Sequence, residues 1–180
     1  TTAAAIMTIE DFKSQPNLKP YFDGAYGYAN FPTIGKGGFG IGGAAGSGMV
    51  FVNNNQNQQV VGEVQMIQLS FGWQLGGQVY SEVIFFESQK DFDNFTSGNF
   101  EFGADANVVA LSASASVKAS TIGNQGGQAG WTPQEIEVDN ARPELSKAVY
   151  SKGMSVFTIV KGGLMYEASV KGQKFNYKPL

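Results

Sequence analysis

The glycine-rich run GKGGFG at residues 35–40 is the segment of this sequence best suited to binding an anion. Its spacing satisfies G-x-G-x-x-G, but a dinucleotide site needs that motif between a strand and a helix, and the residues that follow are too rich in glycine for a helix. Glycine N–H groups and the ammonium of Lys36 could instead form a nest for a lipid phosphate. Lys36 and Phe39 are therefore candidate lipid contacts, and the alternative is an ordinary solvated lysine on a turn between two strands.

A second set of candidates mixes cations and aromatic rings near the start of the chain. Lys13 and Lys19 flank two expected short helices and stand close in sequence to Phe12, Tyr21 and Phe22. Such a mixture suits a membrane interface, because lysine stems and aromatic rings contact apolar groups while the ammonium groups reach lipid headgroups. The same residues suit helices that pack on a sheet. Lys13, Lys19, Tyr21 and Phe22 are candidate lipid contacts with packing as the alternative.

Residues able to perform covalent or acid–base catalysis are poorly arranged in this sequence. Ser47 lies outside any G-x-S-x-G elbow, and the chain contains no histidine to act as its base and no cysteine. Asp91 and Asp93 would point to different faces of a helix, which makes a catalytic carboxylate pair improbable. Zinc sites built from cysteine or histidine are excluded too. We expect no enzyme activity, no cofactor and no metal site.

Composition favours one exported, mostly β-structured domain and argues against a nucleic-acid binder. The 180 residues can bury one hydrophobic core, and the 24 glycines and 13% aromatic residues fit strands and tight turns. A formal net charge of −3 provides no basic field for DNA or RNA. The chain starts at Thr1 without an initiator methionine, so we expect a periplasmic or secreted product from which a signal peptide was removed.

Sequence patterns predict short helices in residues 4–14, 17–23 and 88–95, the first two forming an N-terminal helical segment over about 4–23. Asn17 is the expected N-cap of the second helix and Ser88 that of the third, which should end at Gly98. Residues 122–147 are expected to form a long exposed loop. About seven strands are predicted, among them 64–75, 79–86, 107–118, 154–160, 164–170 and 174–177.

Two of these strands alternate apolar and polar residues with a period of two. In residues 64–75 the apolar face consists of Ile67, Leu69, Phe71, Trp73 and Leu75. In residues 107–118 it includes Val109 and Leu111. These faces are expected to be buried, and a curled sheet could make part of them line an acyl-chain cavity. The candidate cavity residues are Leu69, Phe71, Trp73, Val109 and Leu111.

Five ordered blocks carry a resemblance to a known family. They begin with LKPYFDGAYGYANFP at residues 18–32 and TIGKGGFGIGG at 33–43, and continue through GGQVYSEVIFF at 76–86 and FDNFTSGNFEF at 92–102. The last block is KGGLMYEAS at 161–169 with GQKF at 172–175. Together they cover most of residues 10–178, and the chain resembles the bacterial SYLF-domain (Ysc84-like) family.

The resemblance implies a lipid- or fatty-acid-binding protein, since bacterial relatives look like exported proteins of that kind, often lipoproteins. Eukaryotic relatives are described as binding phosphoinositides and some as binding actin, a property that we do not carry over. This sequence departs from the family in its long 122–147 segment and in having no cysteine that could be acylated.

We therefore expect one domain over residues 1–180 in the α+β class, predominantly antiparallel. Its form should be a single curved sheet or partial barrel with two or three short helices. The expected function is that of a non-enzymatic, membrane-associated lipid-binding module whose partner is a lipid or membrane surface. The alternative is a structural, self-associating extracellular or envelope protein that forms homo-oligomers, because Asn/Gln-rich turns and glycine-rich ribbons also suit edge-to-edge assembly.

Overall fold

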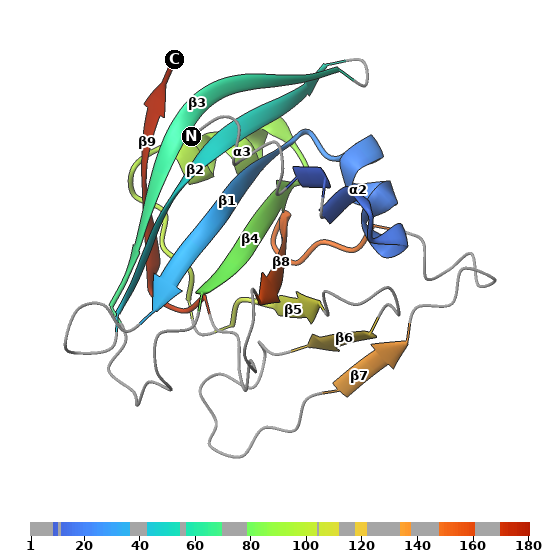
Figure 1. Cartoon of the computed structure of the whole chain (residues 1–180). Helices are drawn as coiled ribbons and strands as arrows, with labels where there is room; N and C mark the ends of the chain where they lie inside the picture. The colour runs from blue at the N-terminus through green and yellow to red at the C-terminus, as the bar shows by residue number, and fades with distance from the viewer. Residues whose placement is uncertain are drawn as a thin grey trace.

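One curved sheet organises the molecule (Figure 1). The computed structural model describes residues 9–10, 12–36, 43–54, 57–69, 79–103, 105–111, 118–121, 134–137, 148–160 and 170–180. Within them a nine-stranded sheet has the order β7-β6-β5-β8-β4-β1-β2-β3-β9. All neighbours pair antiparallel except β5 and β8, which are parallel. The predicted α+β, predominantly antiparallel class is confirmed.

The strands and helices have the following bounds. The strands are β1 (Gly27–Lys36), β2 (Ala44–Asn54), β3 (Asn57–Gln68), β4 (Val79–Phe86), β5 (Val108–Leu111), β6 (Lys118–Thr121), β7 (Gln134–Glu137), β8 (Met154–Val160) and β9 (Gln173–Pro179). A 3-10 turn, η1 (Pro16–Leu18), leads into α2 (Lys19–Gly24), and α3 is Gln89–Thr96. Residues 9, 10, 12 and 13 are helical as well.

The strand predictions for 79–86 and 154–160 match β4 and β8. The described residues form nine strands, where about seven were expected. One of them corrects the loop prediction, because Gln134–Glu137, inside the segment 122–147, forms β7. It does so because it pairs with β6 from Lys118↔Glu137 to Thr121↔Gln134. The rest of that segment and most of the predicted strand 164–170 lie outside the described residues.

The sheet curls so that strands distant in the order meet across its inner face. Phe31 of β1 and Phe175 of β9 have ring centroids 5.7 Å apart, although β2 and β3 separate these strands in the sheet. The inner face buries Ile84, Phe86 and Met66 against Phe95 of α3. This curvature confirms the prediction of a curved sheet.

The outer face of the sheet carries the N-terminal helices. Tyr28, Phe51, Phe85 and Phe157 project from β1, β2, β4 and β8 into one buried cluster. The helical segments cover this cluster with the apolar side chains Ile9, Phe12, Leu18, Tyr21 and Phe22. A sheet covered on both faces explains why β4, in its centre, is apolar at nearly every position.

The ends of the helices follow the sequence rules in one case and not in the other. The Ser88 side chain accepts a hydrogen bond from the Asp91 N–H while Asp91 reaches back to the Ser88 N–H, so the predicted cap of α3 is confirmed. Gly98, with φ of +91°, follows the helix as expected. Asn17 is not a cap: Pro16 starts the helical turn one residue earlier, which places Asn17 inside η1.

The alternation in residues 64–69 is real, but the buried face is the opposite of the predicted one. Val64, Met66 and Gln68 are buried, whereas Ile67 and Leu69 have exposed fractions of 55% and 54%. The reason is that the inner face has polar partners for Gln68, whose side-chain amide donates to the Lys171 carbonyl oxygen at 3.0 Å. The apolar pair at Ile67 and Leu69 therefore points outward.

The register of the strands defines two ends of the sheet. At the first, the hairpin end, β2 turns into β3 between Asn54 and Asn57. At the second, the connection end, six strand termini lie level: Lys36, Ala44, Gln68, Val79, Val160 and Gln173. Strands of ten to twelve residues put these ends about 30 Å apart, at roughly 3.3 Å per residue.

Candidate functional site

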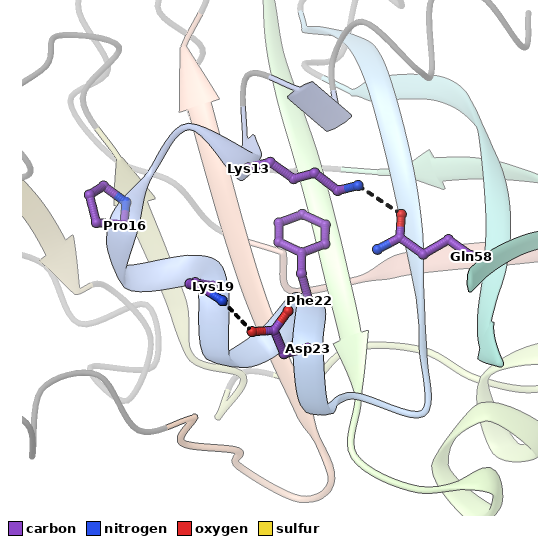
Figure 2. Close-up of a pocket in the computed structure, with 6 residues that line it drawn as sticks. All are labelled: Lys13, Pro16, Lys19, Phe22, Asp23 and Gln58. Atoms are coloured by element: carbon purple, nitrogen blue, oxygen red, sulfur yellow. Dashed lines mark hydrogen bonds and ion pairs between the residues drawn. The ribbon is translucent and has the colours of Figure 1, made fainter. Parts of the chain in front are cut away.

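A groove on the outer face, near the hairpin end, is the candidate site (Figure 2). Its volume is about 410 Å³, and its lining residues come from the N-terminal helices and the start of β3: Lys13, Pro16, Lys19, Phe22, Asp23 and Gln58. Figure 2 shows Lys13 and Lys19 on two sides of the Phe22 ring. The structure thus brings together three of the residues that the sequence proposed as lipid contacts.

Lys13 is held in place by a hydrogen bond and by an aromatic ring. Its Nζ donates to Gln58 Oε1 at 3.0 Å and lies 5.7 Å from the centre of the Phe22 ring, a cation–π distance. Gln58 Oε1 also accepts a hydrogen bond of 2.7 Å from the Tyr28 hydroxyl. Burial, and then the nearby charge of Glu10, raise the pKa of Tyr28, so this hydroxyl stays a neutral donor.

Lys19 forms a helical ion pair one turn along α2. Its Nζ lies 2.8 Å from Asp23 Oδ2, and both side chains are mostly exposed to solvent. An exposed pair of this spacing contributes only about 0.3–0.5 kcal/mol, so a stronger anion can compete with the aspartate. Each ammonium has three N–H donors, so Lys13 and Lys19 have more donors than their hydrogen bonds to Gln58 and Asp23 use.

The floor of the groove is a rigid aromatic cluster. The Phe22 ring meets Tyr28 at 5.2 Å and Phe85 at 4.9 Å, both edge to face. The Asn53 side-chain amide donates to the carbonyl oxygens of Phe22, Asp23 and Ala25 and so ties the end of α2 to the hairpin. The sequence analysis did not single out Asn53 or Gln58, because both side chains act through contacts distant in sequence.

Tyr21 belongs to the core beneath the groove. It is 7% exposed, and its hydroxyl donates to the Val149 carbonyl oxygen at 3.0 Å and accepts from the Val149 N–H at 2.9 Å. For Tyr21 the packing alternative holds. Its ring stands over Phe85 and Phe157 and attaches α2 to the sheet.

The other described candidates from the sequence do not line the groove. Lys36 is the last residue of β1, at the connection end. Leu69 is also at that end and exposed, while Val109 is half-buried beneath the outer-face cluster. Leu111 ends β5. Phe39, Phe71 and Trp73, together with the side chains of Lys36 and Leu111, lie outside the described residues. The structure therefore places Lys36 and Leu69 at the end of the sheet opposite to the groove.

A buried polar cluster on the inner face was not foreseen. Gln173 Nε2 donates to Glu82 Oε1 at 3.0 Å and lies 3.4 Å from both Tyr80 OH and Gln68 Oε1. Burial, reinforced by the charge of Glu82, raises the pKa of Tyr80 far above its ordinary value. The signal in the sequence was the single charged residue within VYSEVIFF, a strand otherwise suited to a core.

The described part of the chain has neither a cluster of metal ligands nor a membrane-spanning helix. Across those residues, no three acidic, histidine or cysteine side chains gather closely enough to hold a metal ion. Among the same residues, none of the helices has the length and apolar character needed to span a bilayer.

Comparison with known proteins identifies the family. The sequence profile of the Ysc84 family, described as "Las17-binding protein actin regulator", matches residues 67–178, more than half of the chain. The chain belongs to this family. Members share the SYLF domain, and at the level of the family this domain is associated with lipid binding.

A curated relative supports the assignment to the SYLF family. Beta cell expansion factor A of Aeromonas veronii is 28% identical to the chain over 174 residues, covering 97% of the chain and 54% of the relative. The chain thus spans about half the length of this relative. No solved structure matches the SYLF chain.

Proposed function

We propose that this SYLF chain is a non-enzymatic lipid-binding module that holds an anionic lipid headgroup in the groove of Lys13, Lys19 and Phe22. The observation that carries the proposal is the placement of two exposed ammonium groups around one aromatic ring in a concave surface. Family-level lipid binding supports the same conclusion.

The groove has the donors that a phosphate needs and the apolar contact that a glycerol or acyl chain needs. Lys13 and Lys19 present ammonium donors, and charge-assisted hydrogen bonds to phosphate oxygens are the strong class of hydrogen bond. Pro16 supplies apolar surface, and the Phe22 ring, which is only 6% exposed, forms the floor between the two lysines. Asp23 neutralises part of the positive charge of the groove. The groove therefore favours a headgroup with one negative charge, a phosphodiester, over a headgroup with several negative charges.

The outer edge of β9 argues for the lipid binder over the self-associating alternative. Part of this edge is already bonded, since the Phe102 N–H donates to the Gln173 carbonyl oxygen and the Gly172 N–H to that of Phe102. The strand also contains Lys174, Lys178 and Pro179, and lysine and proline on an edge strand oppose pairing with another chain.

A soluble lipid separates headgroup recognition from membrane docking. Titration with monomeric dihexanoyl phosphatidylglycerol, followed by calorimetry, should give saturable binding that weakens as salt rises. The double variant Lys13→Gln/Lys19→Gln should bind about 10- to 30-fold more weakly and lose most of the salt dependence, at roughly 1 kcal/mol for each lysine.

The matched control removes two exposed lysines elsewhere, Lys90 on α3 and Lys178 on β9. Lys90→Gln/Lys178→Gln has the same net charge as the groove variant and should bind like the unaltered chain. Equal weakening in both double variants would show a general charge effect and no groove site. Equal affinity for dihexanoyl phosphatidylcholine would show that the anionic charge is not recognised.

A further inference from the structure

Two large aliphatic side chains are exposed on the outer face at the connection end. Along β3 the outward positions beyond the bulge are Glu63, Gln65 and Ile67, and Leu69 follows with the same exposure as Ile67. The exposed face of the strand thus changes from polar to apolar as it approaches this end. Single exposed aliphatic residues are common, but two on one face at the end of a strand form a patch.

The patch is bordered by cations. Ile67 pairs across the sheet with Lys174 of β9, whose ammonium lies 3.5 Å from Glu101 and is mostly exposed. Exposed Lys171 adjoins the patch, because its carbonyl oxygen accepts from the side chain of Gln68, and its neighbour Gly172 lies against the Leu69 carbonyl. Aliphatic tips beside lysine ammonium groups are the chemistry of an anionic membrane interface.

The sequence of the chain segments that leave this end has the same character. The segments 37–43 and 70–78 contain no charged residue, and 161–169 contains only Lys161 and Glu167. All three connect strand termini that the register places at the connection end. Ile67 and Leu69 therefore turn outward at an end whose connecting segments carry little charge.

We propose that the connection end docks on an anionic lipid bilayer, with Ile67 and Leu69 entering the acyl region and Lys171 and Lys174 meeting the phosphates. The inference rests on the proposed lipid-binding function and adds to it a membrane-facing surface distinct from the groove. The groove lies near Gln58, about 30 Å along β3 from Gln68, so the groove and the patch are separate surfaces that can be altered independently.

The test measures binding to vesicles of phosphatidylcholine containing one-third phosphatidylglycerol. Ile67→Glu/Leu69→Glu should lower the partition coefficient roughly 30-fold or more, because two aliphatic contacts are lost and two negative charges meet an anionic surface. Both residues are more than half exposed, so the variant should fold normally. The control Val149→Glu/Leu180→Glu changes two other exposed aliphatic residues in the same way and should bind like the unaltered chain.

Tryptophan fluorescence supplies an independent readout of depth. The chain has two tryptophans, so Leu69→Trp combined with Trp73→Phe and Trp131→Phe leaves a single tryptophan within the patch itself. Its emission should shift to the blue on binding and be quenched by brominated acyl chains. Vesicle binding without quenching would overturn the inference, as would unchanged binding of Ile67→Glu/Leu69→Glu.

The outcomes also separate this inference from the headgroup site. Saturable titration with the soluble lipid, combined with vesicle binding that only the groove variant loses, would overturn the inference and leave the proposed function standing. Absence of binding to both the soluble lipid and the vesicles would overturn both. A concentration-dependent dimer that forms without lipid and dissociates in Ile67→Glu/Leu69→Glu would assign the patch to a second copy of the chain instead.

Discussion

The two ends of the sheet place polar and apolar groups in opposite ways. At the hairpin end Phe22, Tyr28 and Phe85 point inward, and the charged groups Lys13, Lys19 and Asp23 lie at the surface with polar partners. At the connection end the carboxylate of Glu82 is buried with amide and phenol groups, while Ile67 and Leu69 face outward. The first arrangement is that of a stable globular surface. The second costs free energy in water and is suited to an apolar environment outside the chain.

The largest effect on stability is expected for a side chain that points into the core, compared with one that points outward. Phe85→Ala should lower the free energy of unfolding by about 3–5 kcal/mol, because it leaves a cavity under Tyr21, Phe22 and Phe157. Ile67→Ala should change it by less than about 0.5 kcal/mol. Urea unfolding monitored by circular dichroism measures both. Equal losses would mean that Ile67 packs in the core and that the contrast between the ends is wrong.

A smaller effect is expected in the buried polar cluster. Gln173→Ala removes the amide that donates to Glu82 at 3.0 Å and should lower the free energy of unfolding by about 1–3 kcal/mol, the range for a buried acceptor that loses its donor. Asn176→Ala, at an exposed position of the same strand, is the control and should be nearly neutral. If Gln173→Ala were neutral in the same urea series, Glu82 would not depend on this hydrogen bond.

High pH should destabilise the chain through its buried tyrosines. Burial raises the pKa of Tyr150 to about 12 and that of Tyr80 well above its ordinary value, whereas an unfolded tyrosine ionises near pH 10. The unfolded chain therefore loses protons first, so stability is fully retained below about pH 10 and falls as pH rises through 12 and beyond. Urea midpoints from pH 8 to 12 test this. Tyr80→Phe and Tyr150→Phe should each flatten the decline, and an unaltered decline in both would contradict the assignment.

The smallest effect concerns the charge balance of the groove. Asp23→Asn removes the competing carboxylate beside Lys19, so affinity for dihexanoyl phosphatidylglycerol should rise about two- to threefold, with stability lowered by no more than about 0.5 kcal/mol. Asp93→Asn, on α3, raises the net charge equally and serves as the control. A gain in both variants would indicate attraction by net charge and not by the groove.

Local patterns in the sequence were sufficient for much of the fold and for half of the groove. The bounds of β4 and β8 and the cap at Ser88 follow from apolar runs and from capping chemistry. Lys13, Lys19 and Phe22 were found because cations and rings stand together in the sequence. Asn53 and Gln58 were not identified, because nothing in the sequence of a polar turn indicates which helix the turn will contact.

The errors arose where distant contacts decide the outcome. The alternation at Ile67 and Leu69 could not reveal which face would be buried, since the polar partners of Gln68 lie more than 100 residues away. Gln134–Glu137 became a strand through a neighbour that no local signal identifies. Export, the absence of enzyme activity and the oligomeric state stay predictions.

The order of strands in the sheet also determines which part of the chain can fold by itself. The family profile matches residues 67–178, yet β1, β2 and β3 lie between β4 and β9 in the sheet. A fragment cut at residue 67 would therefore leave β9 without a neighbour and would expose the paired edge of β4. The domain must therefore begin before Gly27, even though the match to the family profile begins forty residues later. A fragment meant for expression or for grafting into another protein needs the same starting point.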